Sequence, residues 1–560
     1  MMRNRNSALS WAALAIVTVA TCPKLIGEPA FQTQPTIRPN PNPAVPLAAI
    51  VSFETVQPVQ TTLTVSDGER QWTLEYPASR NPGEGLPVVG MKYGKSHRIG
   101  VRITSSQGEA ADSPARLRFT TPEKPNDKTL VPPVRVMVSK PEKMEPGYTL
   151  LSLRRVLPRL QGQQRRRMGA TFGLLAAIDH NGEIVWSYQS DARISDVEPL
   201  RNGNFAFVTT DNRATEIDVL GNRVGHWYAA DRPRGEADAI PIPTLTMHHE
   251  IDELSNGNLI VMGTEIREYD NWYTSETDPD APRARERVMG DVIVEFTRDG
   301  TVVWVWKALD HLDPYRIGYE TFTNYWINRG FPGARDWSHG NGFFHDERDD
   351  SLLISFRMQD AVVKVDRKTG EIVWILGDHS GWPLHLQPKL LTPEGEMSWF
   401  YHQHMPQITS NGTLLLFDNR TFSARPFAPP LRPAQTWTRA VEYAINEETR
   451  SVKQLWSSEG QAMDRLMTFA MGEADAMPTT GNVLLFYGSA AVVTDMTLDW
   501  EDVLAPGGGT DRGTRIREFT RTDPSEIVWD IDIYDSSENQ VRWGIYGGAR
   551  ISQFGAHPEK

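Results

Sequence analysis

The chain has 560 residues, with 58 Lys or Arg against 71 Asp or Glu, so its formal net charge is −13. This acidic balance argues against a nucleic-acid-binding protein, in which a basic stripe is expected, and the 39% hydrophobic residues exclude global disorder. A single cysteine, Cys22, excludes a disulfide framework and a Cys-rich zinc site within the chain.

The first residues of the chain predict an export signal. Arg3 and Arg5 precede an apolar run over residues 8–20, which is too short for a comfortable membrane span. Cys22 lies in a lipoprotein-like context, although Thr21 replaces the usual small residue, so lipidation of Cys22 is left open. We expect a signal peptide over 1–22 and a periplasmic or otherwise extracytoplasmic protein. Any membrane attachment would be a lipid at Cys22 or, as the alternative, a retained signal anchor.

Short alternating segments predict a small β domain next. After a Pro-rich linker over 23–47, residues 48–121 contain strand-length segments separated by turns, at 62–65, 72–76, 97–103 and 115–119. Such spacing is typical of an immunoglobulin-like or fibronectin-like β-sandwich. Residues 122–147 are expected to form a second linker.

The remaining residues, 148–560, carry a weak internal repeat. A turn followed by a short β run ends in Trp six times, at Trp186, Trp227, Trp304, Trp374, Trp456 and Trp529. A second hairpin with a turn such as Asn-Gly lies between these copies. Two hairpins per repeat make a four-stranded unit, and such units predict an all-β fold, a six-bladed β-propeller. Residues 543–551 would complete the unit that begins near 148–186; a larger sandwich or a solenoid is the alternative.

Polar residues recur where the innermost strands are expected to begin. His249 and His404 each lie seven residues before a turn Asn, and Asn341 lies eight before the turn Asp. These positions are therefore predicted to be equivalent and to converge on the propeller axis. His339 and His402, two residues before Asn341 and His404, are expected to face the same way because strand side chains alternate.

Arg357 is expected to join this pocket. It follows the apolar strand 352–356, whose end should lie beside the start of the strand near His339. Imidazoles, an amide and a guanidinium without an obvious carboxylate predict a site for a tetrahedral oxyanion. The rival use is zinc or copper held by His402 and His404; because of Arg357 we expect no metal.

The other histidines are expected to be structural. His248 should alternate to the opposite face of its strand and pack there, and His345, His379 and His385 lie in loops or away from the aligned positions.

Three motifs resemble the bacterial aryl-sulfate sulfotransferases that use no nucleotide sulfate donor. They are His248-His249-Glu250-Ile251 before Asn256-Gly257-Asn258, His339-Gly340-Asn341 with Arg357 sixteen residues later, and Gln403-His404 before Leu416-Phe417-Asp418-Asn419. The similarity covers roughly residues 169–551, and it too implies a six-bladed propeller with a small N-terminal sandwich.

The resemblance also implies roles for the residues. His404 matches the catalytic histidine, and the sulfate-holding residues match His249, His339, Asn341 and Arg357. His402 departs from the family pattern as an additional imidazole beside His404, and its auxiliary role is left open between a change in the pKa of His404 and a wider hydrogen-bond network. Some members carry a disulfide in the loop before the catalytic histidine; residues 378–400 contain no Cys.

The expected activity is transfer of a sulfuryl group from an aryl sulfate to a phenol, in two half-reactions through a sulfohistidine at His404. No cofactor is expected, and the chain has no Gly-rich P-loop motif. Either His249 or His339 would protonate the leaving phenolate. The alternatives are a non-catalytic propeller that binds a sulfated or anionic aromatic ligand, and a redox or metal propeller. The natural donor and acceptor, and the oligomeric state, a homodimer included, are left open.

Overall fold

Strands dominate the chain. The computed structural model describes residues 28–156, 169–232, 238–458, 465–504, 513–522, 524–533 and 541–555, and this part is all-β. Its helices are short: α2 (Ala308–His311), α3 (Trp500–Leu504), and the 3-10 turns η1 (Pro82–Glu84), η2 (Ile327–Arg329), η3 (Arg357–Gln359), η4 (Gln387–Lys389) and η5 (Pro433–Gln435). None of the helices in these ranges is long and apolar enough to cross a membrane. The predicted signal peptide and Cys22 lie outside the described residues.

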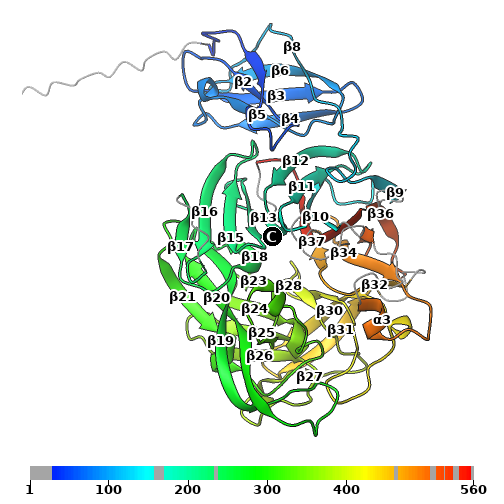
Figure 1. The fold of residues 1–560 in the computed structure, drawn as a ribbon. Helices are drawn as coiled ribbons and strands as arrows, with labels where there is room; N and C mark the ends of the chain where they lie inside the picture. Colours follow the sequence, from blue (N-terminus) through cyan, green and yellow to red (C-terminus); the bar gives the residue numbers. More distant parts are fainter. Residues whose placement is uncertain are drawn as a thin grey trace, which may run out of the picture.

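The N-terminal strands form a small body at one end of the molecule (Figure 1). One sheet has the order β1-β2-β5 and the other β4-β3-β6-β7, with β8 paired to β6. The strands are β1 (Thr36–Pro39), β2 (Ala49–Ser52), β3 (Gln60–Ser66), β4 (Gln71–Tyr76), β5 (Leu86–Val88), β6 (Ser96–Thr104), β7 (Ala110–Asp112) and β8 (Leu117–Thr120). Exposed and buried residues alternate along β6, and buried residues of both sheets share one core.

Sequence patterns located most of this body. The predicted strands at 62–65, 72–76, 97–103 and 115–119 are confirmed as β3, β4, β6 and β8. The predicted linker over 23–47 is wrong for residues 36–39, because these form β1 and pair with β2. The Pro residues that indicated a linker are compatible with β1 because it lies at the edge of its sheet.

Six further sheets follow in chain order. The first has the order β12-β11-β10-β37, from β10 (Tyr148–Val156), β11 (Gly173–Ile178), β12 (Ile184–Ser190) and β37 (Arg542–Ile551). The second runs from β13 to β17: β13 (Ile194–Pro199), β14 (Phe205–Thr209), β15 (Arg213–Ile217), β16 (Arg223–Ala229) and β17 (Ile240–Ile242). The third contains β18 (His248–Glu253), β19 (Leu259–Trp272), β20 (Ala284–Phe296), β21 (Val302–Lys307) and β22 (Ala334–Asp336).

The other three sheets are built from strands in the same way. The fourth contains β23 (Gly340–Asp346), β24 (Ser351–Phe356), β25 (Ala361–Asp366) and β26 (Ile372–Gly377). The fifth contains β27 (Thr392–Pro393), β28 (His404–Ile408), β29 (Leu414–Asp418), β30 (Arg439–Asn446) and β31 (Ser451–Ser457). The sixth contains β9 (Val134–Ser139), β32 (Leu466–Thr468), β33 (Glu473–Ala476), β34 (Val483–Val492), β35 (Gly513–Phe519) and β36 (Ile527–Ile533).

The strands at the two ends of this repeat each pair with a sheet at the opposite end. The last strand, β37, pairs with β10 from Tyr148↔Ile551 to Val156↔Arg542, so the predicted pairing of residues 543–551 with the first unit is confirmed. In the other direction β9 pairs with β36, so the predicted linker over 122–147 is wrong for residues 134–139. Both ends of the repeat therefore carry a strand that completes a distant sheet.

The first and last sheets are neighbours. Contacts join the strands in the order β13, β18, β23, β28, β33, β37 and back to β13. The six repeat Trp residues make a second cycle, because each indole Nε1 donates to the following sheet: Trp186 to Val219 O, Trp227 to Arg298 O, Trp304 to Arg367 O, Trp374 to Glu447 Oε1, Trp456 to Ser525 Oγ and Trp529 to His180 O. The last of these bonds returns to the turn of the first sheet. Sequence periodicity thus marks the residues that connect the sheets.

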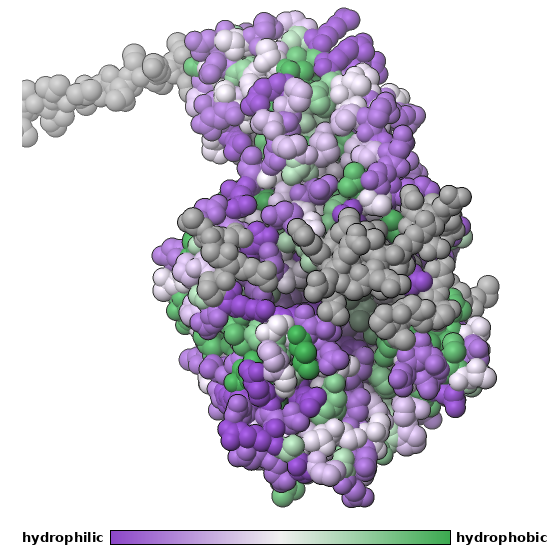
Figure 2. Space-filling model, viewed as in Figure 1, coloured by the Kyte–Doolittle hydropathy of each residue, from purple (hydrophilic) through white to green (hydrophobic). Residues whose placement is uncertain are grey.

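The cores lie between adjacent sheets. Strands β14 and β24 are buried along their whole length, because neighbouring sheets cover both of their faces. Figure 2 shows a mostly hydrophilic surface on the face viewed, with hydrophobic residues scattered over it. The innermost strands carry polar side chains where they begin.

Candidate active site

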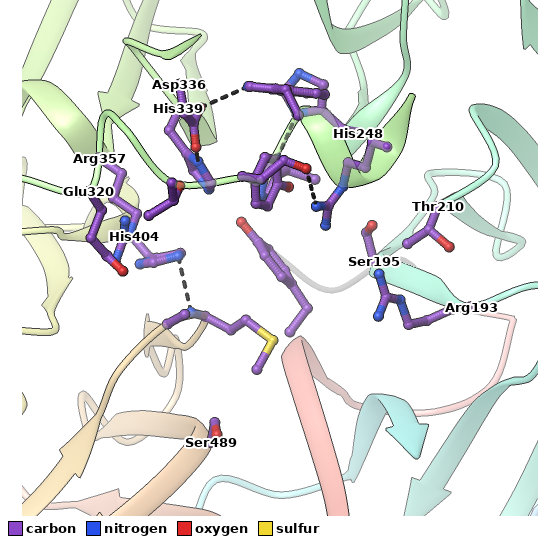
Figure 3. Close-up of a pocket in the computed structure, with 18 of the residues that line it drawn as sticks. Arg193, Ser195, Thr210, His248, Glu320, Asp336, His339, Arg357, His404 and Ser489 are labelled. Atoms are coloured by element: carbon purple, nitrogen blue, oxygen red, sulfur yellow. Dashed lines mark hydrogen bonds and ion pairs between the residues drawn. The ribbon is translucent and has the colours of Figure 1, made fainter. Parts of the chain in front are cut away.

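A cavity of about 350 Å³ lies where the innermost strands β13, β18 and β28 begin. Figure 3 shows its polar residues arranged around the central space. Of the predicted site residues, the structure brings together His249, His339, Arg357 and His404. Two carboxylates, Glu320 and Asp336, also line the cavity, so the expectation of a site without a carboxylate is wrong.

The hydrogen bonds of His404 fix its tautomer. The side chain of Asn419 donates to Thr468 O (2.9 Å) and Met471 O (3.0 Å), so its Oδ1 is the acceptor that lies 2.7 Å from Nδ1 of His404. Nδ1 therefore carries the hydrogen. Nε2 accepts the amide N–H of Met471 at 3.2 Å, which is compatible only with a lone pair on that nitrogen. The cavity thus contains an imidazole with an unprotonated Nε2.

His404 also remains neutral over the physiological pH range. Burial lowers its pKa to about 3, and the charge of Arg357 contributes to the decrease, whereas the hydrogen bond to Asn419 opposes it. A neutral imidazole with a lone pair on Nε2 is the form that acts as a nucleophile, once this lone pair is released from the Met471 N–H.

His339 has a carboxylate partner. Its Nδ1 lies 2.6 Å from Oδ2 of Asp336, and Oδ1 of the same carboxylate accepts the indole N–H of Trp326 at 2.8 Å. Asp336 thereby orients the ring, with Nδ1 as the donor. A histidine held by a buried carboxylate is the usual arrangement for a group that gives and takes a proton.

His249 is held by its neighbour His248. The two Nδ1 atoms are 2.6 Å apart, and Nε2 of His248 lies 3.2 Å from Gly263 O and 3.3 Å from Oδ1 of Asp291. Burial lowers the pKa of His249 well below the usual range, and neighbouring imidazoles act in the same direction. Burial alone would raise the pKa of Asp291, but the hydrogen bond and charge of His248, together with the hydrogen bonds from Ser338 and Gly340, lower it. The expectation that His248 only packs on the opposite face is therefore wrong.

The side chain of Arg357 is paired with a carboxylate. Its backbone N–H donates to His339 O at 3.1 Å, which confirms that the end of β24 lies beside the residues before β23. Its side chain donates to a carboxylate oxygen of Glu320 and, at 3.4 Å, to Phe469 O. Glu320 has a φ of 67°, in the left-handed region, so its backbone is strained where it meets the site.

Two predicted residues do not reach the cavity. The side chain of Asn341 is fully buried and donates to Gln403 O at 2.7 Å, directly before His404. The ring of His402 points elsewhere, with Nδ1 2.6 Å from Oγ1 of Thr421 and the ring edge against Phe422. The cavity lining contains neither residue.

The alternation argument failed for a local reason. The ladders skip residues between His248 and Ile251, between Gly340 and Gly342, and between His404 and Gln407. Such bulges shift which side chains face the axis. His339 and His402 precede their strands and have φ of 46° and 54°, so strand periodicity does not apply to them.

Comparison with known proteins bears on this geometry. The model of the family described as Arylsulfotransferase (ASST) matches residues 134–542. The chain belongs to the arylsulfotransferase family. It is similar to the arylsulfate sulfotransferase AssT of Escherichia coli O6:H1, with 28% identity over 334 residues, and to that of Lelliottia amnigena, with 27% over 327 residues. Each match covers 50% of this chain and 51% of the relative, so the chain spans about half the length of the curated relatives it matches.

Solved structures are only distantly similar to this arylsulfotransferase-family chain. The Dos1 propeller has a TM-score of 0.28 at 8% identity, covering 71% of this chain and 95% of its own. The Pseudomonas brassicacearum lignostilbene dioxygenase has a TM-score of 0.31 at 11% identity, covering 76% and 96%. These values are too low to support an argument.

The sequence reasoning assigned no role to three residues that orient the arylsulfotransferase-family site, although one of them, Asn419, belongs to a motif that carries the resemblance. Asp336 lies three residues before His339, and Asn419 directly follows β29, the partner of β28, so both were within reach of a search around the histidines. Glu320 lies in a loop and gave no signal. In the ranges that the structure describes, no group of three or more His, Cys, Asp or Glu is arranged to hold a metal ion.

Proposed function

We propose that this protein transfers a sulfuryl group from an aryl sulfate to a phenol by way of a sulfohistidine at His404. The observation that carries the proposal is the unprotonated Nε2 of His404 in a cavity that also contains Arg357. Membership in the arylsulfotransferase family supports the same reaction.

In the first half-reaction, Nε2 of His404 attacks the sulfur of the donor. An N–S bond forms as the S–O bond to the aryl oxygen breaks, and protonated His339 gives its proton to the leaving phenolate. In the second, neutral His339 takes the proton of the acceptor phenol, its oxygen bonds to sulfur, and His404 leaves with its electron pair. The cycle restores both histidines and needs no cofactor. The structure thus favours His339, with its Asp336 partner, over His249 as the acid and base.

The remaining residues stabilise charge or hold geometry. Arg357 and His249 face the cavity and would donate to the sulfuryl oxygens, where one such donor is typically worth about 2.7–4 kcal/mol in the transition state. Asn341, through Gln403 O, would position the backbone before His404, and not bind sulfate directly. The auxiliary role of His402 would likewise be support of this backbone.

The architecture has a matching proposal. The six sheets and the two cycles of contacts support a six-bladed β-propeller over residues 134–555. The two N-terminal sheets support a β-sandwich over 28–121. Residues 1–22 would be a signal peptide, which places the protein in the periplasm or another extracytoplasmic compartment.

The test is intact mass after incubation with an aryl sulfate and no acceptor. We expect an adduct of about 80 Da, the mass of a sulfuryl group, on His404. His404→Asn should give none, and His385→Asn, at an exposed loop position, should match the unchanged protein. His249→Asn and Arg357→Lys should slow the adduct by about 10²–10³, because each removes or misaligns one donor. An adduct mapped to His249, or one that persists in His404→Asn, would contradict the assignment.

A further inference from the structure

The cavity contains a second group of cations that the reaction does not use. Arg154 of β10, Arg193 just before β13 and Arg329 of η2 all line it. They come from three separate elements, so the fold has brought them together. Figure 3 shows Arg193 on the side opposite His404 and Arg357.

None of the three arginines has an acidic partner among the described residues. The two carboxylates in the cavity lining are engaged elsewhere, Glu320 by Arg357 and Asp336 by His339. Arg329 donates to Tyr325 O at 3.0 Å and stacks over that ring. The buried Nε atoms of Arg154 and Arg193 have no hydrogen-bond partner in the described part of the chain.

This arrangement is costly without an anion. Burial lowers the pKa of Arg154 to about 9 and that of Arg193 to about 10, and the neighbouring guanidinium charges add to both decreases. Like charges repel, and an unpaired buried charge is destabilising. Part of the surface of each arginine stays open to the cavity, where a ligand can reach it.

The surroundings of these arginines suit a hydrogen-bonding anion. Ser195 and Thr210 lie beside Arg193 in Figure 3, and Asn212 also lines the cavity. Tyr546 and Tyr325 line the cavity as well, so flat aromatic surfaces lie in the same cavity as Arg357 and the three arginines. The ring of Tyr546 is 5.3 Å from that of His249 and 6.1 Å from that of His404.

We propose that Arg154, Arg193 and Arg329 form a second anion subsite, which binds a carboxylate, sulfate or phosphate carried by the part of the aryl substrate that is not transferred. The inference rests on the proposed sulfuryl transfer and names its substrate class: phenols and aryl sulfates that bear an additional negative group. Guanidinium groups bind such oxyanions through paired N–H donors, and the ring would span the space between the two cation groups.

The test compares acceptors that differ only in charge. 4-Hydroxyphenylacetate and 4-hydroxyphenylacetamide have the same shape, and the methylene group insulates the phenol from the change. We expect kcat/KM to favour the acid by about 10- to 100-fold, the usual value of hydrogen bonds to a charged group. Arg193→Gln should bring this ratio close to one, because the acid loses its advantage over the amide, and Arg193→Lys should retain part of it. Arg98→Gln, at an exposed position of β6, is the matched control.

A binding measurement tests the subsite independently of turnover. Calorimetric titration of His404→Asn with each acceptor should show binding of the acid and its loss in the double variant with Arg193→Gln. Absence of any sulfuryl transfer together with selective binding of the acid would reject the reaction and keep the subsite. Efficient transfer with equal kcat/KM for acid and amide, or a preference that survives Arg193→Gln and Arg329→Gln, would overturn the subsite and keep the reaction.

Discussion

Asn419 is the residue whose removal tests the geometry of His404 most directly. Asn419→Ala deletes one hydrogen bond to His404 Nδ1 (2.7 Å) and two to the carbonyls of Thr468 (2.9 Å) and Met471 (3.0 Å). At about 0.5–1.5 kcal/mol net for each of the three bonds, the free energy of unfolding should decrease by about 1.5–4.5 kcal/mol. The variant should therefore be less stable but still folded.

The effect on the reaction should be separate. Without Asn419 no acceptor holds the hydrogen on Nδ1, and only the Met471 N–H still favours a lone pair on Nε2. Nε2 then carries the lone pair for a smaller part of the time, and the ring is freer to turn. Loss of such a supporting bond commonly costs about 10–100-fold. Rapid-quench intact mass should show the sulfuryl adduct forming slower by this factor, while the affinity for an aryl sulfate, measured on a background of His404→Asn, stays within about twofold.

The control for this experiment lies on the same hairpin. Asn411→Ala removes an exposed amide from the β28–β29 turn and should change neither the adduct rate nor the affinity. An unchanged adduct rate in Asn419→Ala would refute the tautomer argument. So would a decrease that matches the unfolded fraction measured by circular dichroism.

Three further outcomes are expected. Because burial lowers the folded-state pKa of His249, His402 and His404, the unfolded chain binds more protons below pH 6.5, so stability should fall as pH decreases from 8 to 5. His404 alone should lower the free energy of unfolding by about 2 kcal/mol between pH 8 and pH 5. Urea unfolding should show a smaller decrease in His404→Gln, and an equal decrease would contradict the buried neutral state of His404. Truncation after Asn539 removes β37 and leaves one edge of β10 without its partner, so soluble expression should be abolished; a truncated protein with unchanged melting would exclude this closure. Cell fractionation with N-terminal sequencing should find the mature chain outside the cytoplasm, and a cytosolic protein that begins at Met1 would count against the export signal.

Sequence periodicity predicted the architecture well where one residue type marks a repeated contact. The six Trp residues were recognisable because each fills the same position of its sheet and bonds to the next sheet. Strands β1 and β9 were missed because each lies in a Pro-containing segment, where local composition indicates a linker, and because the partner of β9 lies far along the chain.

The site was predictable only in part. His249, His339, Arg357 and His404 meet as expected, because all lie near the starts or ends of inner strands. Asn341 and His402 do not, because bulges and positive φ values break the period of two. No pattern in a single sequence reports such local departures.

The contact between Glu320 and Arg357 has a consequence for selectivity. The guanidinium already has an anionic partner in Glu320, so an incoming oxyanion gains only the difference between its own bonds and those of Glu320. A small free ion such as inorganic sulfate obtains nothing else in exchange, whereas an aryl ester also buries its ring. Because Glu320 competes for Arg357, binding discriminates against solutes that offer only a negative charge.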